Sequence, residues 1–98
     1  MNFHNLAFCE DGLPYLGCSI RSLNDSPGME LVLVNSDSPA WHAGLKLGDI
    51  LLEIDHKTVN NIDDYRRCLA NALSDQMKAR NGIELKIIRR GQVKTLLL

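Results

Sequence analysis

A chain of 98 residues is long enough for one domain, and 45% hydrophobic with 23% charged residues is ordinary for a globular protein. Eleven basic and twelve acidic side chains leave a formal net charge of -1. This balance provides no basic field of the kind that binds nucleic acid, so we expect no nucleic-acid partner. We expect one domain over residues 1–98, with residues 1–4 flexible, cut from a larger protein.

The cysteine pattern is used to predict the cellular compartment. The three cysteines are Cys9, Cys18 and Cys68. An odd number at scattered spacings does not form a disulfide framework, so buried free thiols in a reducing, cytoplasmic compartment are expected. The N-terminal residues have no basic segment followed by an apolar run, and we therefore predict no signal peptide. The histidines lack the paired spacing of structural zinc ligands, so we expect no metal and no cofactor.

Short strands dominate the first half of the chain. Residues 16–23 alternate in polarity, residues 24–28 form a dense turn signal, and residues 29–34 are almost continuously apolar, which together predict an antiparallel hairpin. A short helix follows between Ser38 and Gly44. Serine is a good N-cap, and glycine suits the left-handed position after a last helical turn.

The second half continues with a strand over residues 50–54 and a tight turn at residues 55–57. Asn61 is positioned to cap a longer helix, in which apolar residues recur at spacings of three and four. Residues 83–88 and 93–98 predict a final hairpin. Short antiparallel strands with two helices predict a mainly β fold, a partly open barrel or sandwich of five to six strands capped by one short and one longer helix.

One stretch resembles a known family. The segment SPAWHAGLKLGDILLEIDHKTV, which begins at Ser38, contains Ser-Pro-Ala, Ala-Gly-Leu and Gly-Asp in order, followed by an apolar strand and a tight turn. This frame resembles a PDZ domain, and the upstream YLGCSI is similar to the carboxylate-binding loop of that family. The resemblance extends from Asn5 to Leu98. It implies a non-catalytic interaction module that binds short C-terminal or internal peptides by adding them as a strand to a sheet edge.

The resemblance also implies where the peptide binds. The carboxylate-binding loop would consist of Tyr15, Leu16, Gly17 and Cys18. Its backbone N–H groups would form an anion nest, and Gly17 would let the ligand backbone approach closely. The strand that pairs with the ligand would consist of Ser19, Ile20, Arg21 and Ser22. The groove helix, Ile62 to Leu73, would present Ile62, Arg66 and Leu69 to the ligand.

Ligand preferences follow from the same resemblance. Family members that prefer Ser or Thr two residues before the ligand's end usually carry His at the first groove position. Ile62 is apolar, which implies a Φ-x-Φ-COOH tail, where Φ is an apolar residue; a one-residue shift would put Asp63 there and favour a polar or basic residue. Arg66 would favour an acidic ligand residue. The small side chain of Cys18 implies room for a bulky last residue such as Leu, Ile or Phe.

A regulatory, substrate-sensing role within a trypsin-like serine protease stays open as an alternative. The loop, the frame and the start of the helix are similar to PDZ domains of that group. Such protease-type domains usually recruit a different segment to the sheet position that residues 6–9 would occupy here. The parent protein could therefore be an enzyme, although the domain itself would not be catalytic.

A dimerisation or lipid-binding module is the remaining alternative. Arg89 and Arg90 are expected on a solvated turn, and together with Lys78 and Arg80 they would supply cations for a lipid headgroup. We expect a monomer, but the tail that ends at Leu98 also fits the Φ-x-Φ pattern. One copy could therefore insert this tail into the groove of a neighbour.

Overall fold

More of the described residues lie in strands than in helices, as the sequence predicts. The computed structural model describes residues 16–23, 25–75, 77 and 81–98. The elements, in chain order, are β1 (Cys18–Ser22), β2 (Met29–Val34), α1 (Pro39–Ala43), β3 (Ile50–Ile54), β4 (Lys57–Thr58), α2 (Ile62–Ser74), β5 (Glu84–Arg89) and β6 (Gln92–Leu97). Their bounds lie close to those predicted, and the mainly β fold with one short and one longer helix is confirmed.

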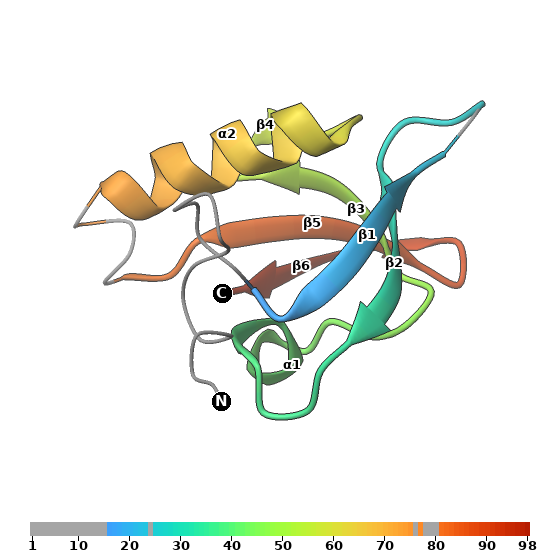
Figure 1. Cartoon of the computed structure of the whole chain (residues 1–98), viewed down its shortest axis with the longest axis horizontal. Coiled ribbons are helices and arrows are strands. Elements are labelled where there is room, and N and C mark those ends of the chain that lie inside the picture. The colour runs from blue at the N-terminus through green and yellow to red at the C-terminus, as the bar shows by residue number, and fades with distance from the viewer. Residues whose placement is uncertain (1–15, 24, 76, 78–80) are drawn as a thin grey trace.

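The strands form one open antiparallel sheet in the order β1-β2-β3-β5-β6, with β4 paired to β3. It is not a closed barrel. In Figure 1, α2 lies across the sheet above β5, and α1 lies below the start of β1. The C-terminal strand β6 forms the edge next to β5, so this edge position is taken by the end of the chain. Residues 6–9, considered for a sheet position from the sequence, lie outside the described residues.

Two tight turns set the hairpin registers. Asp55 and His56, between β3 and β4, have φ angles of 53° and 68°. Arg90 and Gly91, between β5 and β6, have φ angles of 54° and 78°. Two successive residues with positive φ give a turn whose twist matches that of the flanking strands, so both hairpins close with two residues.

The helix α2 is amphipathic, and its buried face is formed by Tyr65, Cys68, Leu69 and Ala72. The side chain of Asn61 accepts a hydrogen bond from the Asp64 N–H at 2.8 Å, which confirms the predicted cap. Through its buried face α2 packs against β1 and β3. The helix therefore lies beside the edge strand of the sheet, where the sequence predicts the groove.

Two basic residues at the β5–β6 turn differ from each other. Arg90 is exposed in the turn, as predicted. Arg89 was also expected to be solvated, but it is partly buried. Its guanidinium pairs with the buried carboxylate of Asp49. Lys78 and Arg80, the other cations considered for a lipid headgroup, lie outside the described residues.

Candidate functional site

The predicted carboxylate loop is held by its carbonyl groups. The Leu16 carbonyl accepts a hydrogen bond from the Ala40 N–H at 2.9 Å, and the Gly17 carbonyl accepts one from the Asn35 N–H at 2.8 Å. In a trans peptide the N–H points opposite to the C=O. The N–H groups of Gly17 and Cys18 therefore point away from Ala40 and Asn35, out of the loop. Tyr15, the first predicted loop residue, lies outside the described residues.

Gly17 is required by the loop itself. Its φ angle is +82°, a conformation that residues with a side chain rarely adopt, and a Cβ at this position would overlap the side chain of Ser38. The Ser38 hydroxyl donates to the Asn35 carbonyl at 2.7 Å and accepts from the Trp41 N–H at 3.1 Å, so it cannot easily move. This contact with Ser38 is a second reason for glycine at position 17, beside the approach of a ligand backbone that the resemblance implies.

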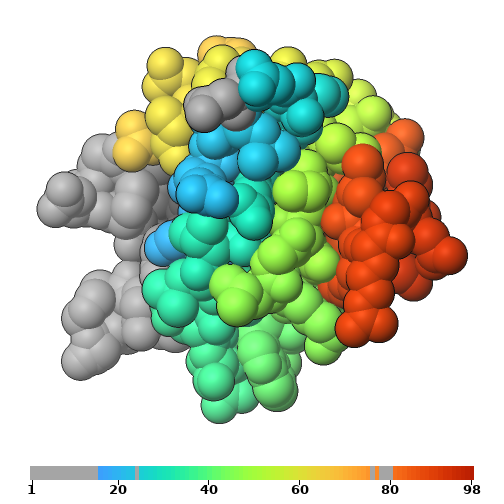
Figure 2. Space-filling model, turned by 90° about the vertical axis from the view of Figure 1, so that its right-hand side faces the viewer, coloured from blue at the N-terminus to red at the C-terminus, as the bar shows by residue number. Residues whose placement is uncertain are grey.

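Strand β1 is an edge strand. Among the strands in the described part of the chain, it pairs with β2 alone. Alternate N–H and C=O groups of an edge strand point away from its partner, which is the template for strand addition. In the space-filling view, β1 (blue) lies directly below the start of α2 (yellow), so this edge borders the helix (Figure 2). Arg21 is engaged with Glu30 of β2, at 2.7 Å.

The three other predicted ligand contacts on β1 differ in burial. Ile20 is partly buried and packs against the core, whereas the Ser19 side chain is exposed. Ser22, at the end of the strand, donates a weak hydrogen bond to the Met29 sulfur at 3.7 Å. A bulge between Ser19 and Ile20 shifts the register against β2, leaving Val32 without a directly opposite partner.

On the helical side, the predicted groove residues lie at different depths. Ile62, at the start of α2, is 41% exposed, and Arg66, one turn later, is also exposed. Leu69 has 0% exposure and belongs to the hydrophobic core, so it lies beneath the surface between β1 and α2. Two of the three predicted positions therefore reach the protein surface.

Sequence reasoning missed Tyr65 as a site residue. Its hydroxyl lies 3.9 Å from the Cys18 sulfur, and its side chain is 8% exposed. Burial raises the pKa of the Cys18 thiol, while the hydrogen bond with Tyr65 acts in the lowering direction. In the sequence Tyr65 is one member of the apolar stripe, and nothing in that pattern indicates a contact 47 residues away.

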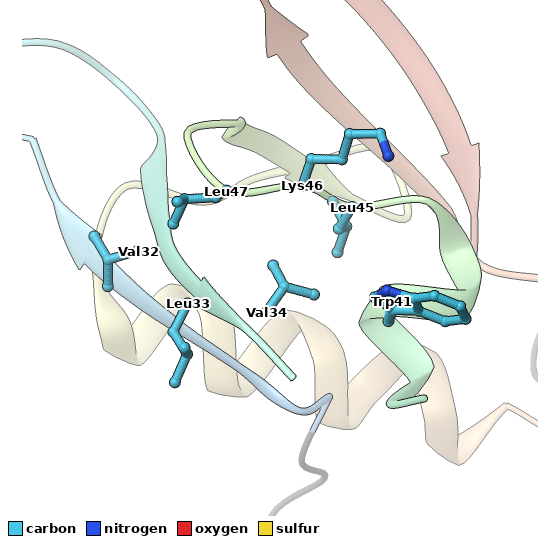
Figure 3. Close-up of a pocket in the computed structure, with 7 residues that line it drawn as sticks. All are labelled: Val32, Leu33, Val34, Trp41, Leu45, Lys46 and Leu47. Carbon is cyan, nitrogen blue, oxygen red and sulfur yellow. The ribbon is translucent and has the colours of Figure 1, made fainter. Parts of the chain in front are cut away.

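A concave surface lies beside α1. It is an open hollow of about 470 Å³ formed by the end of β2, by α1 and by the segment that follows α1. Its lining residues are Val32, Leu33, Val34, Trp41, Leu45, Lys46 and Leu47. Figure 3 shows these side chains around the hollow, with Trp41 projecting from α1. The sequence did not predict this surface, because it combines residues from three different elements.

The chain is similar in sequence to known proteins. A family model described as PDZ domain matches residues 30–78. A probable periplasmic serine endoprotease, DegP-like, from Halomonas elongata is 33% identical over 78 residues, covering 74% of this chain and 15% of that protein. A protein of the same description from Rhizobium meliloti is 30% identical over 66 residues, covering 67% of this chain and 13% of that protein.

Solved structures share the fold. The HtrA3 PDZ domain bound to a phage-derived ligand, FGRWV, has a TM-score of 0.70 at 15% identity, covering 86% of this chain and 81% of that one. The HtrA-type protease AlgW with a decapeptide has a TM-score of 0.69 at 22% identity, covering 85% of this chain and 27% of that one. At these identities the likeness shows the fold.

An open antiparallel sheet, with the edge strand β1 between a glycine loop and a helix, is the fold of a PDZ domain. The chain belongs to the PDZ domain family. It resembles in particular the PDZ domains of trypsin-like proteases, since both curated relatives are DegP-like serine endoproteases. The chain spans about a seventh of the length of these relatives (15% and 13%).

The predicted cytoplasmic location is wrong, because both curated relatives are described as periplasmic. The cysteine argument failed for a physical reason. Cys18 and Cys68 are free, and both are at least partly sheltered from solvent. Oxidation depends on the exposure and the thiolate content of a cysteine, so sheltered thiols are compatible with an oxidising compartment. Among the helices of the described residues, none has the length and apolarity that crossing a bilayer requires.

Proposed function

We propose that this domain binds the C-terminal tails of partner proteins between β1 and α2. The tail adds to β1 as an antiparallel strand, and its carboxylate accepts hydrogen bonds from the loop at Leu16, Gly17 and Cys18. The outward direction of the Gly17 and Cys18 N–H groups, next to an edge strand, is the observation that carries this proposal. Tyr15 would complete the loop, and the domain itself performs no chemistry.

The groove favours apolar tails of the form Φ-x-Φ-COOH. Ile62 is half-exposed at the first turn of α2 and offers an apolar surface to the third-from-last ligand residue. Arg66, one turn further on, favours an acidic ligand residue, with a contribution of about 0–1 kcal/mol because it is exposed. A short strand buries less surface than a standard interface, so binding is expected to be weak and reversible.

A role within a protease is the second candidate. Two curated relatives are serine endoproteases, and the edge next to β5 is formed by the C-terminal strand β6. We propose on this basis that the domain senses substrate tails for a periplasmic serine endoprotease, whose catalytic residues lie outside it. In the full-length parent protein, a binding peptide should change the rate of proteolysis, and the Gly17→Ala variant should not respond.

Self-association through the C-terminal tail is less favoured. The Leu98 N–H donates to the Ile83 carbonyl at 2.9 Å, and β6 pairs with β5 from Gln92 to Leu97. To enter the groove of a neighbour, the tail would have to give up this pairing. The tail therefore serves the sheet of its own domain, and the monomer remains our proposal.

The test uses the 98-residue chain and a library of C-terminal peptides, each made as free acid and as C-terminal amide. Gly17→Ala should abolish binding, because the substitution places a Cβ against Ser38 and distorts the loop. Gly48→Ala is the matched control: Gly48 has a similar φ of +91°, but no atom lies within 4 Å of a Cβ built there. If amidation leaves every affinity unchanged, carboxylate recognition is refuted.

A further inference from the structure

The space between β1 and α2 beside Cys18 is filled by the chain's own side chains. The Tyr65 hydroxyl reaches across from α2 to within 3.9 Å of the Cys18 sulfur. Tyr65 itself is buried, and Leu69, one turn further along α2, is completely covered. The volume that a small residue at position 18 leaves open is therefore occupied by the phenol of Tyr65.

A bound tail would bring its last side chain to this place. With its carboxylate on the N–H groups of Gly17 and Cys18, the ligand strand ends beside the start of β1. Side chains on neighbouring strands stand on the same face of a sheet when they are directly opposite. The last ligand side chain therefore points into the space between β1 and α2, where it meets the hydroxyl of Tyr65.

The size of the last ligand side chain decides whether Tyr65 can keep its position. A methyl or isopropyl group adds little volume, whereas a Leu or Phe side chain has to displace the phenol. Displacement exposes an aromatic side chain that packs in the core, and forcing extra volume into a filled space strains its neighbours. The small side chain of Cys18 predicted room for a bulky residue, but that argument did not include Tyr65.

We infer that Tyr65 is a specificity-determining residue that restricts the last ligand side chain to a small apolar group, Ala or Val. This inference rests on the proposed function, because it assumes that a carboxylate binds at the loop. It makes the last Φ of the tail small, while the first Φ, the apolar residue opposite Ile62, remains free in size.

The first experiment uses the wild-type 98-residue chain and four peptides that differ only in their last residue, Ala, Val, Leu or Phe. Each peptide carries valine at the third-from-last position and is also made as an amide. Titration should show that the tighter binder of the Ala and Val peptides has an affinity at least about tenfold higher than that of the Phe peptide. Tighter binding of the Leu or Phe acid overturns the inference and leaves the proposed function intact. Equal binding of acids and amides overturns both.

Variants then assign the selectivity to Tyr65. Tyr65→Leu keeps an apolar side chain but no longer reaches Cys18, and it should strengthen binding of the Leu and Phe peptides relative to Val. Tyr65→Phe removes the hydroxyl alone and preserves the ring packing, so it should shift the preference in the same direction by less. Arg67→Ala, on the exposed face of α2, is the matched control and should leave the ranking unchanged. An unchanged ranking in both Tyr65 variants would assign the preference to another residue.

Discussion

Arg89 and Asp49 connect the end of β5 to the segment before β3 through two parallel hydrogen bonds. The Nε and Nη2 groups of Arg89 donate to Oδ1 and Oδ2 of Asp49 at 2.8 and 2.6 Å. Nη2 also donates to the Gly44 carbonyl at 2.7 Å, at the end of α1. The Asp49 side chain is 2% exposed, against 22% for Arg89, so a nearly buried carboxylate is paired with the cation of Arg89 and also accepts a hydrogen bond from the Lys46 N–H at 2.8 Å.

Removing the arginine should therefore be costly. Arg89→Met keeps the apolar part of the side chain and leaves Asp49 buried without its cation, which should lower the free energy of unfolding by about 3–5 kcal/mol in urea titrations. Arg21→Met is the matched control, because Arg21 pairs with Glu30 but its side chain is 66% exposed. That variant should lose at most about 1 kcal/mol. Equal losses in both variants would contradict the assigned role of burial.

Substitutions at the two helix caps should have similar effects on stability but different effects on peptide binding. Ser38→Ala and Asn61→Ala each remove a side-chain acceptor from a helix N-terminus, at a cost of about 1 kcal/mol. Only Ser38 also contacts the loop, since it packs against Gly17 and holds Asn35. Peptide titration should show a clear loss of affinity for Ser38→Ala and a small one for Asn61→Ala. A larger loss of affinity for Asn61→Ala than for Ser38→Ala would argue against the loop at Gly17 as the peptide-binding site.

The third-from-last ligand position should respond to Ile62. The wild-type chain should bind a peptide with Val there more tightly than one with Thr. Ile62→His introduces a hydrogen-bonding side chain at the same place and should reverse that order. Arg67→His, on the exposed face of the same helix, serves as the control and should preserve the order. Competition titrations with the Val and Thr peptides measure the order of affinities in each chain. A wild-type preference for Thr would refute the apolar assignment of this ligand position.

The Cys18 thiol should make stability depend on pH. Burial raises its pKa above the ordinary 9.0, so the folded state keeps the proton longer than the unfolded state does. Its contribution to stability is therefore complete below about pH 9 and decreases as the pH rises through the folded-state pKa. Urea titrations at several pH values from 8 upward should show a steeper decline for wild type than for Cys18→Ala. If the stability of wild type and of Cys18→Ala declined in parallel, the pH dependence would not come from the Cys18 thiol.

Alkylation gives an independent measure of the same thiol. In a chain that carries C9A and C68A, iodoacetamide should modify Cys18 more slowly than it modifies the same chain in urea, because the thiolate is the reactive form. A binding peptide should slow the reaction further, since it covers the start of β1. Equal rates in the folded and unfolded chains would show that the thiol is accessible and unperturbed.

Local features of the sequence were sufficient for much of the fold. Caps and turns depend on residues within a few positions of each other, so Ser38, Asn61 and the turn at Asp55 and His56 were placed correctly from the sequence. Strand bounds followed from alternation and from the glycine and proline punctuation between segments. The groove position followed from the resemblance, which combines a local frame with a known arrangement of strands.

Contacts between distant residues were not accessible in this way. Arg89 looked like a solvated turn residue because its partner, Asp49, lies 40 positions earlier. Tyr65 looked like an ordinary core residue because its reach to Cys18 depends on how α2 lies on the sheet. Leu69 was placed on the groove wall by the resemblance together with helical spacing, whereas its depth depends on what packs above it. Contacts and burial of these side chains therefore required the structure.

The hydrogen bonds of Leu16, Gly17 and Ser38 have a mechanical consequence. They join the loop, the end of β2 and the start of α1 through backbone groups, so these three segments should move as one body. The helix α2 contacts β1 through side chains such as Tyr65, so its position depends on side-chain packing. A ligand that widens the proposed groove should therefore displace α2 at the cost of this packing, while the loop at Gly17 keeps its shape.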